Sequence, residues 1–107
     1  ALNVKIEASK TTIKPGEVVE IEVKYTQLPE TRVLVDWINV TEFGKLSETE
    51  EEKLTWTAPD NINTLEVIEV INAVVTGVSR MISTDGLDTR TQILTGTKTI
   101  LLTVTGT

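Results

Sequence analysis

The chain has 107 residues, a formal net charge of −6, and neither cysteine nor histidine. Without these residues it has no disulfide or thiolate metal site, and it lacks the commonest general base and metal ligand. Its acidic balance disfavours nucleic acid as a partner, and no apolar run approaches the roughly 20 residues that span a bilayer, so we expect no direct membrane insertion.

Alternation of apolar and polar residues, typical of strands with one face buried, is the dominant pattern along the chain. It is clearest in VVEIEVKY (residues 18–25), where it predicts that Val19, Ile21 and Val23 face a core. We expect strands at residues 2–8, 18–25, 33–37, 54–58, 65–78 and 97–105, and a loop or short edge strand in the polar segment 41–53. About seven short antiparallel strands with regular turn signals predict one all-β sandwich domain over residues 1–107.

Residues 65–82 permit two interpretations. A helix is one, because apolar residues fall there at helical spacing: Leu65, Ile68, Ile71, Val75, Val78 and Ile82. The many β-branched residues favour a strand instead, since they lose rotamer freedom in a helix. The alternation slips near residues 67–70, which predicts a bulge or a strand buried on both faces. We then expect Glu66 and Glu69 to face solvent or to lie at the bulge.

The last two predicted strands continue beyond the length a sandwich needs, through VTGVSRMISTDGLDTRTQILTG (residues 75–96). A turn centred on Gly86-Leu87 would place Gly77 opposite Gly96. A long hairpin over residues 76–96 would then leave the sandwich, with residues 78–95 projecting. The alternative is a hairpin that folds back and completes the core.

The projecting part of this hairpin is the candidate contact site. It is neutral, since Arg80 and Arg90 balance Asp85 and Asp88, while the rest of the chain carries the net charge. Its apolar side chains exceed what an isolated two-stranded ribbon can bury, so we expect contact with a protein partner, a neighbouring module or a second copy. The predicted contact residues are Met81, Ile82, Asp85, Gly86, Leu87, Asp88, Ile93 and Leu94.

Three segments carry a resemblance to known domains. KTTIKPGEVVEIEV joins a Pro-Gly turn to an alternating strand, VLVDWINV centres on Trp37, and LTWTAPD is a strand followed by a loop. Together they resemble immunoglobulin-like and PKD-like β-sandwich modules of prokaryotic surface or secreted proteins. The resemblance implies a core position for Trp37 and an extracellular or cell-surface location. The chain departs from immunoglobulin domains in lacking their cysteine pair, and its hairpin is longer than such modules need.

The two tryptophans have a structural interpretation beside a functional one. Trp37, which follows valines at positions 33 and 35, is expected in the core. Trp56 is expected in the core or partly exposed near an edge, where it could stack on a sugar. With only one Phe and one Tyr besides, an aromatic sugar-binding platform is hard to build.

Two polar features also have alternative interpretations. The acidic run could bind calcium, but it lacks the alternating Asp/Asn and Gly pattern of a calcium loop, which favours a solvated charged loop; its members are Glu48, Glu50, Glu51 and Glu52. Asn39 begins the sequon Asn-Val-Thr and is a candidate glycosylation site, although a threonine-rich chain yields such a match by chance.

No nucleophile elbow, phosphate-cradling glycine loop or metal-spaced cluster occurs in the sequence, so we expect no catalysis, cofactor or metal. We expect a non-catalytic structural or adhesive module of a larger cell-surface or secreted protein, acting as a spacer or protein-contact unit. One alternative is a subunit of a surface layer, pilus or viral particle that self-assembles through the long hairpin. The other is a carbohydrate-binding module.

Overall fold

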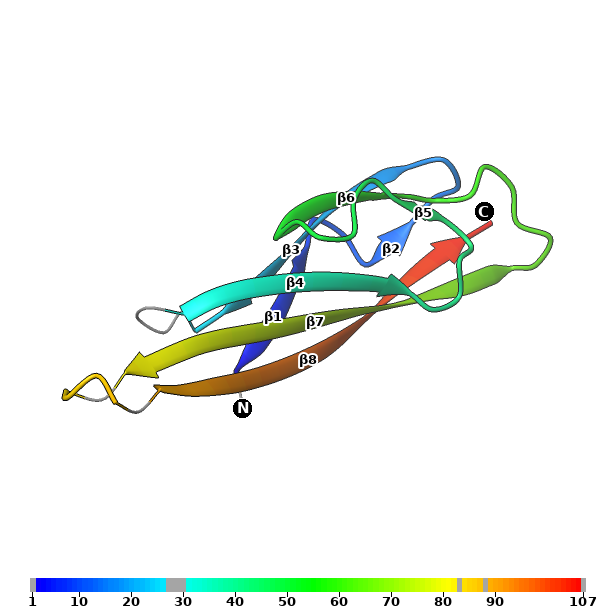
Figure 1. Ribbon diagram of the computed structural model, residues 1–107. Coiled ribbons are helices and arrows are strands. Elements are labelled where there is room, and N and C mark those ends of the chain that lie inside the picture. The colour runs from blue at the N-terminus through cyan, green and yellow to red at the C-terminus, as the bar shows by residue number, and fades with distance from the viewer. Residues whose placement is uncertain (1, 27–30, 83, 88, 107) are drawn as a thin grey trace.

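The computed structural model describes residues 2–26, 31–82, 84–87 and 89–106 (Figure 1). This part of the chain contains strands and no helix, so it has no helix long and apolar enough to cross a membrane. The strands are β1 (Val4–Ala8), β2 (Thr12–Ile13), β3 (Val18–Tyr25), β4 (Thr31–Asn39), β5 (Lys45–Leu46), β6 (Lys53–Thr57), β7 (Glu66–Ile82) and β8 (Thr89–Thr105). The prediction of an all-β chain is confirmed.

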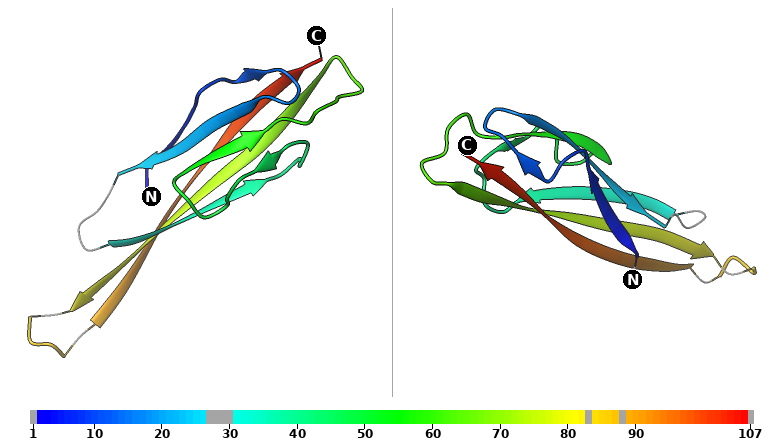
Figure 2. Two further views of the ribbon diagram at one scale, coloured as in Figure 1. Left: turned by 90° about the horizontal axis from the view of Figure 1, so that it is seen from above. Right: turned by 180° about the vertical axis from the view of Figure 1, so that it is seen from behind.

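The strands form two four-stranded sheets, ordered β1-β3-β6-β5 and β2-β8-β7-β4. Their inner faces share one apolar core in a sandwich-like arrangement (Figures 1 and 2). The first sheet contributes Val19, Ile21, Val23, Leu54 and Trp56, and the second contributes Val35, Trp37, Ile71, Ala73, Val75, Leu102 and Val104. The expected inner face of β3 is therefore confirmed.

The strand count and directions differ from about seven antiparallel strands. The described residues form eight strands. Strand β5, at the edge of its sheet, is the short edge strand that was one of the two expectations for the polar segment 41–53, whereas β2 was not expected. Strand β2 pairs with β8 in parallel, with Thr12 opposite Thr103 and Ile13 opposite Val104. A two-residue strand leaves too little alternation for a sequence pattern to reveal.

The interpretation of residues 65–82 as a helix is wrong, and so is the predicted bulge. Strand β7 is 17 residues long and pairs with the 17 residues of β8 in one unbroken antiparallel register from Glu66 to Ile82. The β-branched residues of β7 suit this extended backbone. The slip in the pattern arises because both faces of β7 carry apolar side chains, as in Val70 and Val74 on one face and Ile71 on the other.

The long hairpin between the last two strands is present, but its predicted register is wrong by two residues. Gly77 lies opposite Leu94, and Gly96 lies opposite Val75. The turn is centred one residue earlier than expected, since Gly86 adopts a φ of 73° and the Leu87 N–H donates to the Asp85 carboxylate at 3.0 Å. Gly96 has another role: a Cβ there would collide with the carbonyl oxygen of Leu2, where the chain enters β1.

The acidic loop before β6 closes one side of the two sheets. The Trp37 backbone N–H donates to Thr49 O at 2.8 Å, and its indole Nε1 donates to Glu51 O at 2.7 Å. The Val23 N–H of the other sheet donates to Glu52 O at 2.9 Å. The four glutamates of the run are exposed, as predicted for a solvated loop, while its backbone connects β4 to β3.

Replacing Ile21 by Ala should lower the free energy of unfolding by about 2–5 kcal/mol, because the side chain is 1% exposed and its loss leaves a cavity. Replacing the exposed neighbour Glu20 by Ala should change it by less than about 0.5 kcal/mol. Urea denaturation of both variants measures the difference. Equal losses at the two positions would contradict the assigned face of β3.

The single tyrosine provides a pH-dependent test of the contact between β3 and the acidic loop. Partial burial, and then a hydrogen bond from the Tyr25 hydroxyl to the Glu52 carboxylate, raise the pKa of Tyr25 to about 12. A raised pKa favours the neutral phenol in the fold. The stability it contributes is complete below the unfolded pKa of about 10 and is lost as the pH rises through about 12.

Titration of tyrosine absorbance should therefore give a midpoint near 12 in the folded chain and near 10 in denaturant. The Glu52→Gln variant should titrate between these values, because it removes the charged acceptor and keeps the partial burial. Circular dichroism at each pH shows whether the chain is still folded. A folded midpoint near 10 would refute the contact.

Candidate functional site

The hairpin between β7 and β8 extends beyond its neighbouring strands. Strand β4 accompanies β7 as far as the pair Thr31 and Ser79, and Ser79 lies opposite Gln92. Residues 80–91, called here the hairpin arm, continue along the long axis of the molecule (Figure 2, left). The described residues thus extend 66 Å in one direction and 20 and 19 Å in the other two. The hairpin does not fold back over the core, and its free part is shorter than the predicted 78–95.

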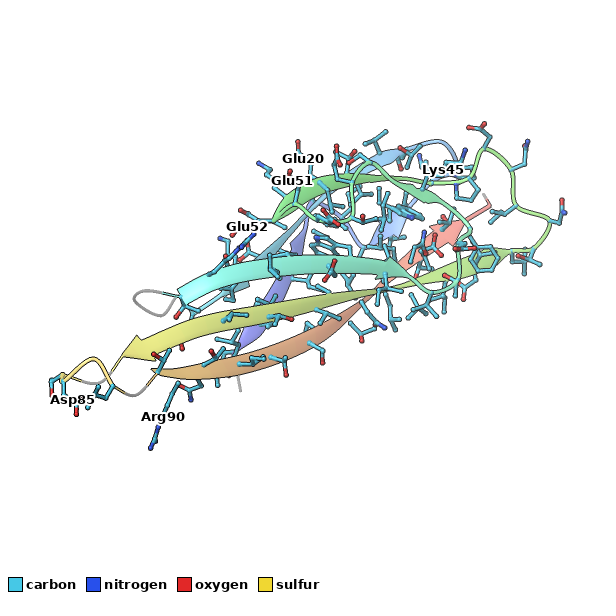
Figure 3. All side chains as sticks on the ribbon, in the orientation of Figure 1. Glu20, Lys45, Glu51, Glu52, Asp85 and Arg90 are labelled. Atoms are coloured by element: carbon cyan, nitrogen blue, oxygen red, sulfur yellow. The ribbon has the colours of Figure 1, made fainter. Side chains whose placement is uncertain are left out.

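The structure spreads the predicted contact residues over the turn and both strands. Asp85, Gly86 and Leu87 are exposed in the turn, and Asp85 and Arg90 extend from the arm in Figure 3. Leu87 is 88% exposed, whereas Ile93 is 63% exposed on the outer face of β8. Leu94 is half-buried on the opposite face. Met81 and Ile82 lie in β7, but their side chains, and all of Asp88, fall outside the described residues.

The outer face of the β2-β8-β7-β4 sheet continues onto this arm and is almost uncharged in its described part. Within residues 31–39, 66–79 and 93–103, the outer face carries three charged residues. Two of them, Arg32 and Asp36, lie on β4, and the third, Glu66, lies at the end of β7. Large apolar side chains are exposed along it: Leu34, Ile38, Ile68, Ile93 and Leu101. An extended apolar surface of this kind is typical of a protein-contact site. The sequence analysis identified only its Ile93 end.

The free edge of β8 is a second feature that the sequence analysis missed. The Leu2 N–H donates to Thr95 O at 3.2 Å, and the Thr103 N–H donates to Thr11 O at 2.8 Å. Both bonds lie on the side of β8 away from β7. Because backbone groups alternate in direction along a strand, the odd-numbered residues of β8 direct their N–H and C=O toward this edge.

A buried carboxylate lies at the other end of the sheets. Glu69 is fully buried, which corrects the expectation that it faces solvent. Its register position puts it on the inner face of β7, two residues from Ile71. Figure 3 shows side chains filling the space between the two sheets.

Five groups donate hydrogen bonds to the Glu69 carboxylate. Oε2 accepts from Gly44 N at 2.6 Å, Trp56 Nε1 at 3.0 Å and Asn39 Nδ2 at 3.3 Å. Oε1 accepts from Phe43 N at 3.1 Å and from the Thr41 hydroxyl. These bonds hold the loop 40–44, where Glu42 has a φ of 58°, against the core. Every buried polar side-chain atom in the described residues has a hydrogen-bond partner.

The same bonds involve two residues that sequence analysis considered for other roles. Trp56 is fully buried and its indole N–H is committed to Glu69, while Trp37 is 3% exposed, so neither ring can stack on a sugar. Asn39 Nδ2, the atom a glycan would modify, also donates to Gly44 O at 3.1 Å. Glycosylation at Asn39 would replace one of the two Nδ2 hydrogens and so remove at least one of these bonds; it stays a prediction.

Comparison with protein-family models, with curated protein sequences and with solved structures finds no match to this chain. Among the described residues, no group of three or more acidic side chains is arranged to hold a metal ion. The candidate contact features of the described chain are the arm, the outer face and the β8 edge.

Replacing Glu69 by Ala should lower the free energy of unfolding by about 3–5 kcal/mol, because it leaves buried donors without an acceptor. Glu69→Gln should cost nearly as much, since its amide places N–H groups against N–H donors. Glu66→Ala is the matched control, on the same strand and exposed, with an expected change below about 0.5 kcal/mol. Thermal and urea unfolding measure the three variants, and a mild Glu69→Ala would show that the carboxylate is dispensable.

Proposed function

We propose that this chain is a non-catalytic contact module that binds another protein surface through the hairpin arm and the adjoining outer face of its sheet. One observation carries the proposal: Leu87 is 88% exposed in the turn of a ribbon that extends past the sandwich-like body, and Ile93 is 63% exposed on the adjoining outer face of the sheet. Exposing such side chains in water is unfavourable, and a partner surface would bury them.

An immunoglobulin-like assignment of the fold belongs to this proposal. The order β1-β3-β6-β5 corresponds to the ABED sheet of such domains, and β8-β7-β4 corresponds to the GFC sheet. Buried Trp37 on β4 occupies the position of the core tryptophan on strand C. The resemblance to modules of surface or secreted proteins supports a structural or adhesive role outside the cell.

A self-assembling subunit is the second candidate, favoured by the unpaired backbone edge along the described part of β8. A carbohydrate-binding module has less support, because both tryptophans are buried. A plain spacer would need neither the arm with its exposed Leu87 nor the exposed Ile93 beside it.

Replacing residues 80–91 with Asn-Gly tests the proposal. Ser79 and Gln92 then flank a two-residue turn, which suits a hairpin whose flanking pair is hydrogen-bonded. The shortened chain should unfold cooperatively, because the described arm residues contribute no side chain to the core. The full chain should show concentration-dependent association in sedimentation velocity, and the shortened chain should not.

Two results would contradict the proposal. A shortened chain that fails to fold would make the arm part of the core. A folded shortened chain that associates as strongly as the full chain would place the contact elsewhere.

A further inference from the structure

We propose that two copies of this chain join arm to arm, with the β8 edge of one copy pairing antiparallel to the β8 edge of the other. The result is a four-stranded sheet in the order β7-β8-β8-β7 across the two copies. This inference rests on the proposed function and names its partner, a second copy, and its binding mode, which is strand addition.

The backbone of the arm is available for such pairing. Thr91 and Ile93 direct their N–H and C=O groups away from β7, in the same phase as Thr95 and Thr103. Within the described chain these groups of Thr91 and Ile93 have no hydrogen-bond partner. An unpaired edge of this kind is a template for another strand.

The other edges of this sheet are obstructed. On β8, the Leu2 N–H donates to the carbonyl oxygen of Thr95, and β2 pairs with Thr103 and Val104. Between these two contacts, only residues 97–101 leave the edge of β8 uncovered. A strand as long as β8 would overrun one of these obstructions. On β4, the Trp37 N–H already donates to Thr49 in the acidic loop. The arm is the part of the sheet where a long strand can approach without displacing the chain.

A second copy suits this edge better than an unrelated strand for two reasons. An antiparallel pair of identical edges is self-complementary, so one segment satisfies itself across a two-fold axis. In addition, beyond Ser79 and Gln92 the arm is a two-stranded ribbon, which is marginal in water, whereas pairing two arms gives four strands. The edge residues Thr89, Thr91 and Ile93 are uncharged, so no like charges meet among them.

Charge and obstruction select one register. Centring the pair on Arg90 would put two arginines opposite each other, which is unfavourable. Centring it on Gln92 or Ile93 would require the backbone of Thr95, whose carbonyl Leu2 occupies. Centring it on Thr91 avoids both: Thr91 faces Thr91 of the second copy and Ile93 faces Thr89. The exposed turn with Leu87 then reaches the Leu2 region of the second copy.

Cysteine cross-linking tests this register, because the chain has no cysteine of its own. Hydrogen-bonded antiparallel pairs have Cα atoms about 5.5 Å apart, within disulfide range. Thr91→Cys should form a disulfide-linked dimer at least tenfold faster than Thr97→Cys in the same redox buffer. Thr97 is the matched control. It lies on the same edge and face of β8, but in the body, where Leu2 and β2 obstruct a long strand on either side of it.

Proline substitution tests the backbone pairing. Thr91→Pro removes an N–H that faces the free edge, so no ladder bond to β7 is lost. We expect it to weaken dimerisation at least tenfold in sedimentation equilibrium. Thr97→Pro removes an equivalent N–H from the body and should leave dimerisation within about twofold of the unsubstituted chain.

The outcomes separate this inference from the proposed function. If association needs the arm but Thr91→Cys does not cross-link faster and Thr91→Pro does not weaken it, edge pairing is overturned and the arm remains the contact. If association survives loss of residues 80–91, both fail. If the full chain stays monomeric up to about 1 mM, pairing between copies is overturned, and contact with another protein remains.

Discussion

The unbroken antiparallel pairing of β7 with β8 is the constraint on which the rest of the second sheet depends. Because side chains alternate between faces, a one-residue slip would exchange the buried and exposed sides of one strand relative to the other. The observed register puts Ile71, Ala73 and Val75 in the core together with Leu102 and Val104. It also decides which backbone groups of β8 face the free edge. Core, outer face and edge are thus consequences of one register, and the 17-residue length of both strands extends it into the arm.

Glu69 shows what this register costs and how the cost is offset. The inner phase of β7 places a carboxylate where the neighbouring positions are apolar, and burying it without partners would be unfavourable. The loop 40–44 offsets this by directing backbone and side-chain donors at it, and Trp56 adds its indole N–H. Gly44 permits the approach, since a Cβ there would collide with the Trp56 ring. The carboxylate therefore fixes the positions of a loop and of a core tryptophan at once, so a buried charged group helps to specify a single packing arrangement.

Alternation predicted the parts of the fold whose two faces differ most. Strand β3, with valine and isoleucine alternating with glutamate, has the expected face inside. The length of the last hairpin was also predictable, because apolar alternation continues past the sandwich. Three features were not. The register of the hairpin depended on the hydrogen bond that Asp85 accepts in the turn, and β2 was too short to show a pattern. Glu69 was expected to face solvent, because its hydrogen-bond donors come from residues 25 to 30 positions earlier and from Trp56. Each of these depends on contacts that sequence periodicity does not encode.

The distribution of charge and of protected edges points to the same end of the molecule. The arm holds two arginines and two aspartates, so it is neutral, and the remaining chain carries the net charge of −6. Two acidic bodies repel at short range, and this repulsion falls off over a Debye length of about 8 Å at physiological ionic strength. A contact made side by side along two extended arms keeps most of each body away from the other, whereas a contact between body edges would bring the bodies together. Leu2, β2 and the acidic loop cover edges of this sheet in the body, whereas its neutral end, the arm, is uncovered. Charge repulsion therefore opposes pairing between two copies least at the arm.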